Sequence, residues 1–322
     1  MIPDDAKRIL YQGDKKAATR NAYGEKLVEL GETNSDIVVM DCDLSKSTMT
    51  AMFAKKFPER FFNFGIAEAN MMSAAAGMAT MGKIPFVSTF GVFASKRACD
   101  QVSISVAYPG LNVKICATHC GISVGEDGAT HQAIEDVAIM RAIPGIVVIS
   151  PSDGTETKKV IDAVVEYKGP CYVRLTRGVS PLLFNDGYKF KIGSGTRIYE
   201  GLNATVVTAG YTTHICFSVA AKLESEGISV DLINMSSIKP VDRKLICESA
   251  EKTGLVFTVE DHSIIGGLGS AVCEVLSEEL PTKVVRIGVQ DKFGASGSPA
   301  ELYAAYGLDE QSIMKVIREN IK

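Results

Sequence analysis

VKICATHCGISVGEDGATHQAIEDVAIMRAIPGIVVISPS, residues 113–152, is the stretch that decides the fold. It begins with a short run rich in apolar residues, VKICATHC, continues through an amphipathic helical pattern, HQAIEDVAIMRAI, and ends in a second apolar run, IVVISPS. Two such runs joined by a helix are typical of a strand–helix–strand unit, in which the strands are parallel and the helix covers one face. The segment therefore predicts a parallel α/β sheet.

The same alternation of short apolar runs and helical patterns extends toward both ends of the chain. The segment EANMMSAAAGMATMG (68–82) has the small and apolar residues of a packed helix. Further strands are predicted at DIVVMDCDL (36–44), IPFVSTF (84–90) and CYVRLT (171–176). Because nearly continuous apolar strands are typical of sheets covered on both faces, we expect helices on either side.

A break in this pattern occurs at RGVSPLLFNDGYKFKIGSG (177–195), where Pro, Gly and Asp-Gly recur and no helical period survives. Alternation then resumes, with strands expected at 204–210, 228–235, 255–261 and 282–289 and helices at 218–225, 243–252 and 269–280. The predicted fold class is α/β, with two three-layer αβα domains whose sheets are mostly parallel. We expect residues 1–185 to form the first domain and residues 186–322 the second, smaller one.

The composition limits the classes of function. Hydrophobic residues make up 46% of the 322 residues, charged residues 22%, and the net charge is −4, which is typical of a soluble globular protein. No basic face suggests nucleic acid, and no polybasic or long apolar run suggests a membrane. The first residues lack the apolar region of a signal peptide, and eight irregularly spaced cysteines are typical of reduced thiols. We therefore expect a cytoplasmic protein that binds neither nucleic acid nor membrane.

Four polar loops are predicted at the carboxyl ends of strands in the first domain. They are DCDLSKS (41–47), GIAEAN (65–70), STFGVF (88–93) and the loop over residues 119–131. Since parallel sheets bind ligands at that edge, we expect these loops to converge. The last loop holds two of the four histidines in the chain, one on either side of a Gly-Glu-Asp-Gly turn.

Each candidate side chain in these loops also has a purely structural explanation. Glu68 opens a helix, where the macrodipole favours an acid, and Phe90 and Phe93 could be core residues at a strand-to-helix turn. In CATHC (116–120) a strand would direct the histidine away from both cysteines, so no metal site is predicted. Together, however, an acid, aromatic rings, histidines and arginines suit a flat heteroaromatic cofactor and an anionic, hydroxyl-rich substrate.

In its motifs the sequence resembles the C-terminal half of transketolase, which consists of a pyrimidine-binding domain and a small C-terminal domain. The clearest motif is THCGISVGEDGATHQ (118–132). The others are ATRNAYGEKL (18–27), DCDLSKS, FGIAEAN (64–70), STFGVF and VRLTRG (173–178). The resemblance covers essentially the whole chain and implies a thiamine diphosphate enzyme built from these two domains.

The resemblance implies a role for each candidate residue. Glu68 matches the glutamate that bonds the pyrimidine nitrogen N1′ of thiamine diphosphate, and a carboxyl group among apolar neighbours is costly to ionise, which suits a shared proton. Phe90 and Phe93 match the aromatic residues around the pyrimidine ring. The implied substrate contacts are Arg20, Ser47, His119 and Arg177 for the phosphate, and Asp127 and His131 for hydroxyls near the reacting carbon.

The sequence departs from the transketolase pattern at three places. Lys96 stands where a tyrosine is usual, so the pyrimidine pocket is expected to close differently. The run SKRACDQV (95–102) looks more like deoxyxylulose-phosphate synthase, and Ala-Glu-Ala-Asn (67–70) replaces the commoner Arg-Glu-His. These differences bear on the identity of the sugar more than on the cofactor.

One part of the transketolase site has no counterpart in this sequence. Gly-Asp-Gly followed by a later asparagine, which holds the divalent ion on the diphosphate, does not occur. We therefore expect a separate N-terminal transketolase subunit to hold Mg²⁺ or another divalent ion, and with it the diphosphate of thiamine diphosphate. Self-association into an α2β2 assembly that acts on sugar phosphates follows from this expectation.

Three other functions remain open from the sequence. Two are enzymes: a fragment similar to deoxyxylulose-phosphate synthase and the β subunit of a 2-oxoacid dehydrogenase. The expected phosphate contacts, together with GEDGATHQ (125–132), favour ketol transfer between sugars over both. The third is a non-catalytic binding subunit, against which Glu68, Asp127 and His131 argue because all three are intact.

Overall fold

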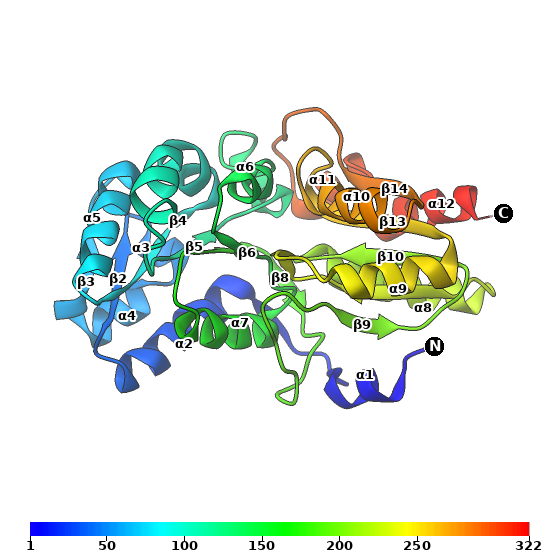
Figure 1. Cartoon of the computed structure of the whole chain (residues 1–322), viewed down its shortest axis with the longest axis horizontal. Coiled ribbons are helices and arrows are strands. Elements are labelled where there is room, and N and C mark those ends of the chain that lie inside the picture. Colours follow the sequence, from blue (N-terminus) through cyan, green and yellow to red (C-terminus); the bar gives the residue numbers. More distant parts are fainter. Residues whose placement is uncertain (322) are drawn as a thin grey trace.

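The computed structural model describes residues 1–321 and contains two main sheets, each with helices packed on both faces (Figure 1). The first sheet has the strand order β12-β6-β7-β5-β4-β2-β3, and the second has the order β14-β13-β10-β11-β9. Neighbouring strands are parallel, except that β12 is antiparallel to β6 and β9 is antiparallel to β11. The predicted α/β class, with two layered domains and mostly parallel sheets, is confirmed.

The first half of the chain forms most of the first sheet and its covering helices. The strands are β2 (Ile37–Asp41), β3 (Phe61–Asn63), β4 (Ile84–Phe90), β5 (Lys114–Thr118), β6 (Val147–Ile149), β7 (Cys171–Arg174) and β12 (Ser237–Lys239). One face packs against α2 (Thr19–Thr33), α4 (Ala51–Lys56) and α7 (Gly154–Glu166). The other packs against α5 (Glu68–Thr80), α6 (Asp136–Ala142) and two π-helical segments, η2 (Phe93–Arg97) and η3 (Gln101–Ala107). Short elements are α3 (Ser45–Thr48), η1 (Pro58–Arg60) and η4 (Ile122–Asp127).

The second half of the chain forms the smaller layered unit. Its strands are β9 (Thr196–Tyr199), β10 (Ala204–Thr208), β11 (Val230–Asn234), β13 (Leu255–Ser263) and β14 (Lys283–Val289). Its helices are α8 (Thr212–Ser225), α9 (Arg243–Thr253), α10 (Leu268–Glu279), α11 (Pro299–Ala305) and α12 (Glu310–Asn320). The N-terminal α1 (Asp4–Ile9) lies beside this unit (Figure 1), and β1 (Lys16–Ala18) pairs with β8 (Val179–Pro181) in a two-stranded ribbon. No helix within residues 1–321 is both long and apolar enough to cross a bilayer.

Local sequence accounts for many of these elements. Strand β4 coincides with the predicted IPFVSTF, and every residue of β2 is buried, as a strand covered on both faces requires. Helix α7 begins where the Asp153 carboxylate accepts a hydrogen bond from the Glu156 amide. Its buried residues Thr157, Val160, Ile161 and Val164 recur at helical spacing, so one stripe of the helix packs on the sheet.

The structure corrects two helix boundaries. The helix predicted from residue 131 begins at Asp136, because Gly128 has a positive φ of 75° and the segment after it forms turns before Ala133 bridges Cys120. The helix predicted from Ser218 begins earlier, at Thr212. The Thr212 hydroxyl bonds the Ala209 carbonyl oxygen, which makes a β-branched polar residue acceptable at that helix start.

Strand pairing and a buried arginine are two of the features that join the two halves of the chain. Strand β12, which belongs to the second half in sequence, extends the first sheet by pairing with β6. The Arg174 guanidinium, which is buried, donates to Asp136 Oδ2 at 2.9 Å, to the Ala133 carbonyl oxygen at 3.0 Å and to the Asp261 carbonyl oxygen at 2.8 Å. One side chain of β7 thus joins α6, the loop before it and β13.

We predict that Arg174→Met lowers the free energy of unfolding by about 3–5 kcal/mol, because the Asp136 carboxylate would stay buried without its counter-ion. Urea denaturation followed by circular dichroism measures this change. The matched control is Arg243→Met, since the Arg243 ion pairs with Glu278 and Glu279 lie on the surface. Equal midpoints for both variants would contradict the prediction.

Candidate active site at the carboxyl edge of the first sheet

The strands β2, β4, β5 and β7 are parallel neighbours, so the loops that follow them meet at one edge of the sheet. The His119 ring, after β5, stacks on the Phe90 ring at the end of β4 with 3.9 Å between centroids. Arg20, on the first turn of α2, donates to the Ser47 carbonyl oxygen at 2.9 Å. Contacts of this kind bring three of the four predicted loops together, and Glu68 joins them through the cavity described below.

Aromatic rings form a continuous wall in the site. Phe90 and Phe93 stack with 5.8 Å between ring centroids, and the His131 ring meets the Phe93 ring edge-on at 5.6 Å. Phe90 is buried and Phe93 is partly exposed. Both phenylalanines therefore contribute to packing, and Phe93 also presents a ring surface to a ligand.

Two arginines approach the same region from different elements. Arg20 Nη1 lies 3.5 Å from His119 Nε2, and Arg177 Nη1 donates to the Val124 carbonyl oxygen at 2.6 Å and to Asp127 Oδ2 at 3.2 Å. Burial lowers the pKa of Arg20, and the charge of Arg177 lowers it further. Within residues 1–321, the buried Arg20 Nε has no hydrogen-bond acceptor. An anion would supply the missing acceptor and relieve the repulsion between the two guanidinium groups.

His119 is held in a conformation that few residues adopt. Its φ is 57°, in the left-handed region, which is costly for a residue with a side chain and is found most often where function requires it. Its Nδ1 lies 2.9 Å from Thr118 Oγ1. Because a guanidinium only donates, Nε2 accepts from Arg20, which assigns the proton to Nδ1 of a neutral ring.

The electrostatic surroundings agree with a neutral His119. Burial lowers the pKa of His119 to about 3, and the positive charges of Arg20 and Arg177 and the neighbouring His131 act in the same direction. At neutral pH the ring can accept one hydrogen bond and donate another without adding charge to the site.

Glu68 lines a small cavity beside this wall. The cavity has a volume of about 270 Å³ and is lined by Cys42, Asp43, Leu44, Ile66, Glu68, Phe93, Arg97 and His131. Glu68 opens α5 and only 4% of its surface is exposed. Its Oε1 accepts a hydrogen bond from Arg97 Nη1 at 3.1 Å, so the carboxyl group has a cationic partner as well as apolar neighbours.

Arg97 is the residue that the sequence analysis missed. It lies at the end of the π-helical segment η2, and its guanidinium covers the Phe93 ring at 4.0 Å from the centroid while it binds Glu68. Helical periodicity in the sequence could not place Arg97 beside Phe93 and Glu68, because a π-helical turn has a different number of residues per turn from an α-helix. Lys96, at the usual tyrosine position, instead forms an ion pair with Glu135 at 3.1 Å.

The remaining predicted residues lie along the rim of the site. Asp127 ends η4 and is exposed apart from its bond to Arg177. His131 Nδ1 lies 2.9 Å from Thr130 Oγ1, which leaves its Nε2 edge available. All nine predicted residues therefore belong to one connected region: Arg20, Ser47, Glu68, Phe90, Phe93, His119, Asp127, His131 and Arg177. Within residues 1–321, no three His, Cys, Asp or Glu side chains are grouped to hold a metal ion.

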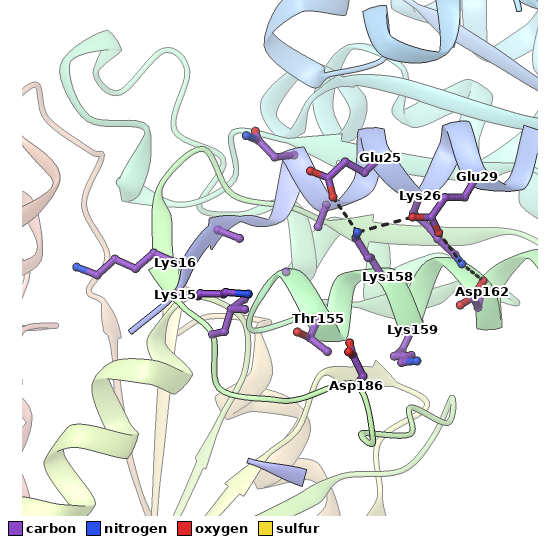
Figure 2. A pocket seen from close by; sticks show the side chains of 15 residues that line it. Lys15, Lys16, Glu25, Lys26, Glu29, Thr155, Lys158, Lys159, Asp162 and Asp186 are labelled. Carbon is purple, nitrogen blue, oxygen red and sulfur yellow. Dashed lines mark hydrogen bonds and ion pairs between the residues drawn. The ribbon is translucent and has the colours of Figure 1, made fainter. Parts of the chain in front are cut away.

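A larger cavity, of about 730 Å³, lies between α2 and α7 and contains none of the nine predicted residues (Figure 2). Five of its nine charged side chains form ion pairs with one another. Lys158 bonds Glu25 at 2.7 Å, and Lys26 bonds Asp162 at 2.8 Å, so these groups join the two helices (Figure 2). The smaller cavity at Glu68 is therefore the better candidate for chemistry, although it is not the larger of the two.

Family models match both parts of the chain. Residues 15–181 match the pyrimidine-binding domain of transketolase, and residues 193–313 match the transketolase C-terminal domain. The first of these domains places the protein in the class of thiamine diphosphate enzymes, as the part that binds the pyrimidine. Within that class, the chain belongs to the transketolase family and corresponds to its C-terminal part.

Individual relatives agree with this assignment. A protein of Methanocaldococcus jannaschii named as a transketolase C-terminal section is 51% identical over 306 residues, or 94% of this chain and 96% of that protein. Human transketolase is 38% identical over 312 residues, which span 96% of this chain but 50% of the human protein. A solved split-gene transketolase, described as an inactive β4 tetramer, has a TM-score of 0.88 at 51% identity and covers 94% of this chain and 97% of its own.

We predict that His119 makes the folded chain less stable in acid. Between pH 6.5 and about pH 3 the unfolded chain binds a proton at this ring that the folded chain does not. The free energy of unfolding should therefore fall by about 1.4 kcal/mol for each pH unit lost in this range from His119 alone. In His119→Asn the slope should be shallower by this amount, as measured by urea denaturation between pH 6 and pH 4 at one protein concentration. Parallel profiles for the two proteins would contradict the assignment of a neutral, buried ring.

Proposed function

We propose that the chain is the C-terminal subunit of a transketolase that transfers a two-carbon ketol unit from a ketose phosphate to an aldose phosphate. A separate N-terminal subunit completes the active site. The observation that carries this proposal is the pairing of a buried Glu68 and the Phe93 ring in one small cavity, within a chain that matches 96% of a relative named as a transketolase C-terminal section.

The residues around this cavity fit the aromatic end of thiamine diphosphate. Glu68 would hold a proton between its carboxyl oxygen and a ring nitrogen, and Phe90 and Phe93 would support the ring face. When bound, thiamine diphosphate supplies a carbon nucleophile and an electron sink for the ketol carbon. Glu68 can bond the ring through Oε2 while Oε1 keeps its bond from Arg97, because a carboxylate has two accepting oxygens.

The cationic rim fits the phosphate of a sugar substrate. Arg20 has an unpaired buried Nε, and Arg177 lies near enough to lower the pKa of Arg20, so both can turn toward one anion. Ser47 and His119 lie in contact with Arg20 and would bond the same phosphate, His119 by carrying its ring proton on Nε2 instead of Nδ1, because phosphate oxygens accept. Asp127, which is bonded to Arg177, and His131, which meets the Phe93 ring edge-on, would bond sugar hydroxyls, because a carboxylate accepts and an imidazole both accepts and donates.

The partner subunit would hold Mg²⁺, or another divalent ion, and the diphosphate. This division is supported by the lack of Gly-Asp-Gly in the sequence and by the cavity volume of about 270 Å³, below the ~300–1,000 Å³ of most ligand pockets. We propose an α2β2 assembly with a symmetric pair of these chains. The β4 tetramer of the solved relative supports self-association of this kind of chain.

We also propose a domain boundary between residues 185 and 186 and a cytoplasmic location in a pentose phosphate pathway. The boundary is supported by the two family models, which leave residues 182–192 between them unmatched. Eight free cysteines support a reducing compartment.

Ketol transfer is favoured over the alternatives left open by the sequence. Both family models describe transketolase domains, and the relatives described above are named as transketolases or parts of them. These matches support a sugar transferase over a 2-oxoacid dehydrogenase subunit or a synthase that uses pyruvate. A coupled assay of the reconstituted enzyme separates these reactions. Turnover of xylulose 5-phosphate with ribose 5-phosphate is expected, and turnover of pyruvate with glyceraldehyde 3-phosphate in its place would reject the proposal.

The division of the cofactor site predicts that neither chain retains thiamine diphosphate alone. The chain, its partner and an equimolar mixture are each passed through gel filtration with the cofactor and Mg²⁺, and bound cofactor is then measured. We expect about one cofactor for each pair of chains in the mixture and loss of it from either chain alone. Stoichiometric retention by the isolated chain would end the split-site proposal.

The role of Glu68 predicts a selective loss of catalysis. In the reconstituted enzyme Glu68→Gln should lower kcat by about 10²–10⁴-fold, the range for loss of a general acid–base group, while the unfolding midpoint of the chain changes little. The control is Glu59→Gln on the exposed turn η1, which should leave both quantities unchanged. Near-normal turnover by Glu68→Gln would remove Glu68 from the catalytic machinery.

A further inference from the structure

The loop that carries Asp127 and His131 is bonded to Arg177 of the first domain and is also attached to the second domain at two points. Near its start lies Gly121, whose φ is 79°, and a Cβ at this position would lie 2.0 Å from Asp261 Oδ2 on β13. Only glycine allows so close an approach of the loop backbone to that carboxylate. The loop and the second domain are therefore in direct contact before any ligand binds.

Asp261 forms the first attachment of this loop. Its Oδ1 accepts a hydrogen bond from the Ile122 amide at 2.9 Å, and its Oδ2 accepts one from the Tyr303 hydroxyl of α11 at 2.6 Å. Asp261 and Tyr303 are both buried. Burial raises the pKa of Asp261 to about 6, and the charge of Arg174 and the bonds from Tyr303 and Ile122 oppose that rise. At neutral pH the group is therefore a carboxylate that accepts both bonds.

Gln132 forms the second attachment, at the other end of the loop. Its side chain is 1% exposed, and its Nε2 donates to the Ala295 carbonyl oxygen of the second domain at 2.9 Å. Gln132 directly follows His131, and Ile122 precedes Asp127 by five residues. Asp127 and His131, the proposed hydroxyl contacts, thus lie between two residues, Ile122 and Gln132, that are hydrogen-bonded to the second domain.

We propose that Asp261 and Tyr303 are positioning residues for the sugar-binding loop, so that the second domain sets the geometry of the substrate site without touching the substrate. The inference rests on the proposed function for its kinetic meaning. The structural part of the inference is that the hydrogen bonds from Tyr303 to Asp261 and from Ile122 to Asp261 order residues 121–131. This part does not depend on the proposed function. A displacement of about 1 Å in a substrate-binding group is enough to cost about 10²-fold in rate, so such an arrangement has kinetic consequences.

The first test replaces one hydrogen bond in the full-length chain. Tyr303→Phe keeps the ring on α11 and removes the donor to Asp261. The matched control is Tyr306→Phe, because Tyr306 lies near the same helix but donates to the Phe293 carbonyl oxygen. Hydrogen exchange of residues 121–131 should accelerate in Tyr303→Phe and stay at the native rate in the control. Equal exchange in both variants would overturn the proposal whether or not the chain is a transketolase.

The second test measures kinetics in the enzyme reconstituted with its partner subunit. We expect Tyr303→Phe to raise KM for both sugar phosphates about tenfold, the loss for one hydrogen bond to a charged group. The affinity for thiamine diphosphate and the unfolding midpoint should match those of Tyr306→Phe. A lower kcat with unchanged KM would also support positioning, because misplaced hydroxyl contacts cost rate. Kinetic constants equal to those of Tyr306→Phe, or a fall in cofactor affinity and stability together, would reject positioning.

A conservative change at the acceptor gives an independent measurement. Asp261→Asn retains an oxygen for the Ile122 amide, whereas Asp261→Ala retains none, so exchange of the loop should be slower and KM lower in Asp261→Asn. Identical behaviour of the two variants would reject the role of this carboxylate. Absence of sugar transfer in the native reconstituted enzyme would reject the proposed function, while the exchange measurements would still decide the positioning role.

Discussion

The buried guanidinium of Arg174 is the interaction on which the rest of the structure depends. A buried cation is tolerated only when its charge is matched, and here Asp136 supplies the charge while the carbonyl oxygens of Ala133 and Asp261 accept from Nη2. Burial alone would raise the pKa of Asp136, but Arg174 lowers it below its ordinary value, so the pair stays ionised. One charge therefore fixes the first sheet, α6 and β13 relative to one another.

That arrangement determines where the candidate site can form. The loop over residues 119–135 starts at the end of β5 and returns to α6, so the elements held by Arg174 also hold both ends of the loop. The parallel order of β2, β4, β5 and β7 then brings three kinds of surface to one edge: an aromatic wall, a cationic rim and a buried carboxyl group. Each is suited to a different part of a reaction between a heteroaromatic cofactor and a sugar phosphate.

Charge within the site is balanced by partners that a ligand can replace. Glu68 is nearly buried, and its bond from Arg97 offsets the cost of keeping a carboxylate out of water. The charge of Arg20 is not balanced in this way. A buried donor of its guanidinium lacks an acceptor within residues 1–321, and a second arginine, Arg177, lies nearby. The ring of His119 between these groups adds no charge, since burial and the arginines keep it neutral. Glu68 thus has a partner for its charge, whereas Arg20 has a buried donor without an acceptor in the described residues.

The sequence by itself determined the α/β class, the parallel strands and the nine residues that the structure brings together. Apolar periodicity indicates which residues are buried locally, which is why the predicted strand IPFVSTF coincides with β4. A motif such as THCGISVGEDGATHQ identifies candidate residues that lie close together in the sequence. Tertiary structure alone decided the ion pair of Arg97 with Glu68, the addition of β12 to the first sheet, and the attachment of the loop to Asp261 and Tyr303. These features depend on contacts between residues as far apart as Ile122 and Asp261, and no local pattern encodes such a contact, because its free energy arises only when the two domains have packed.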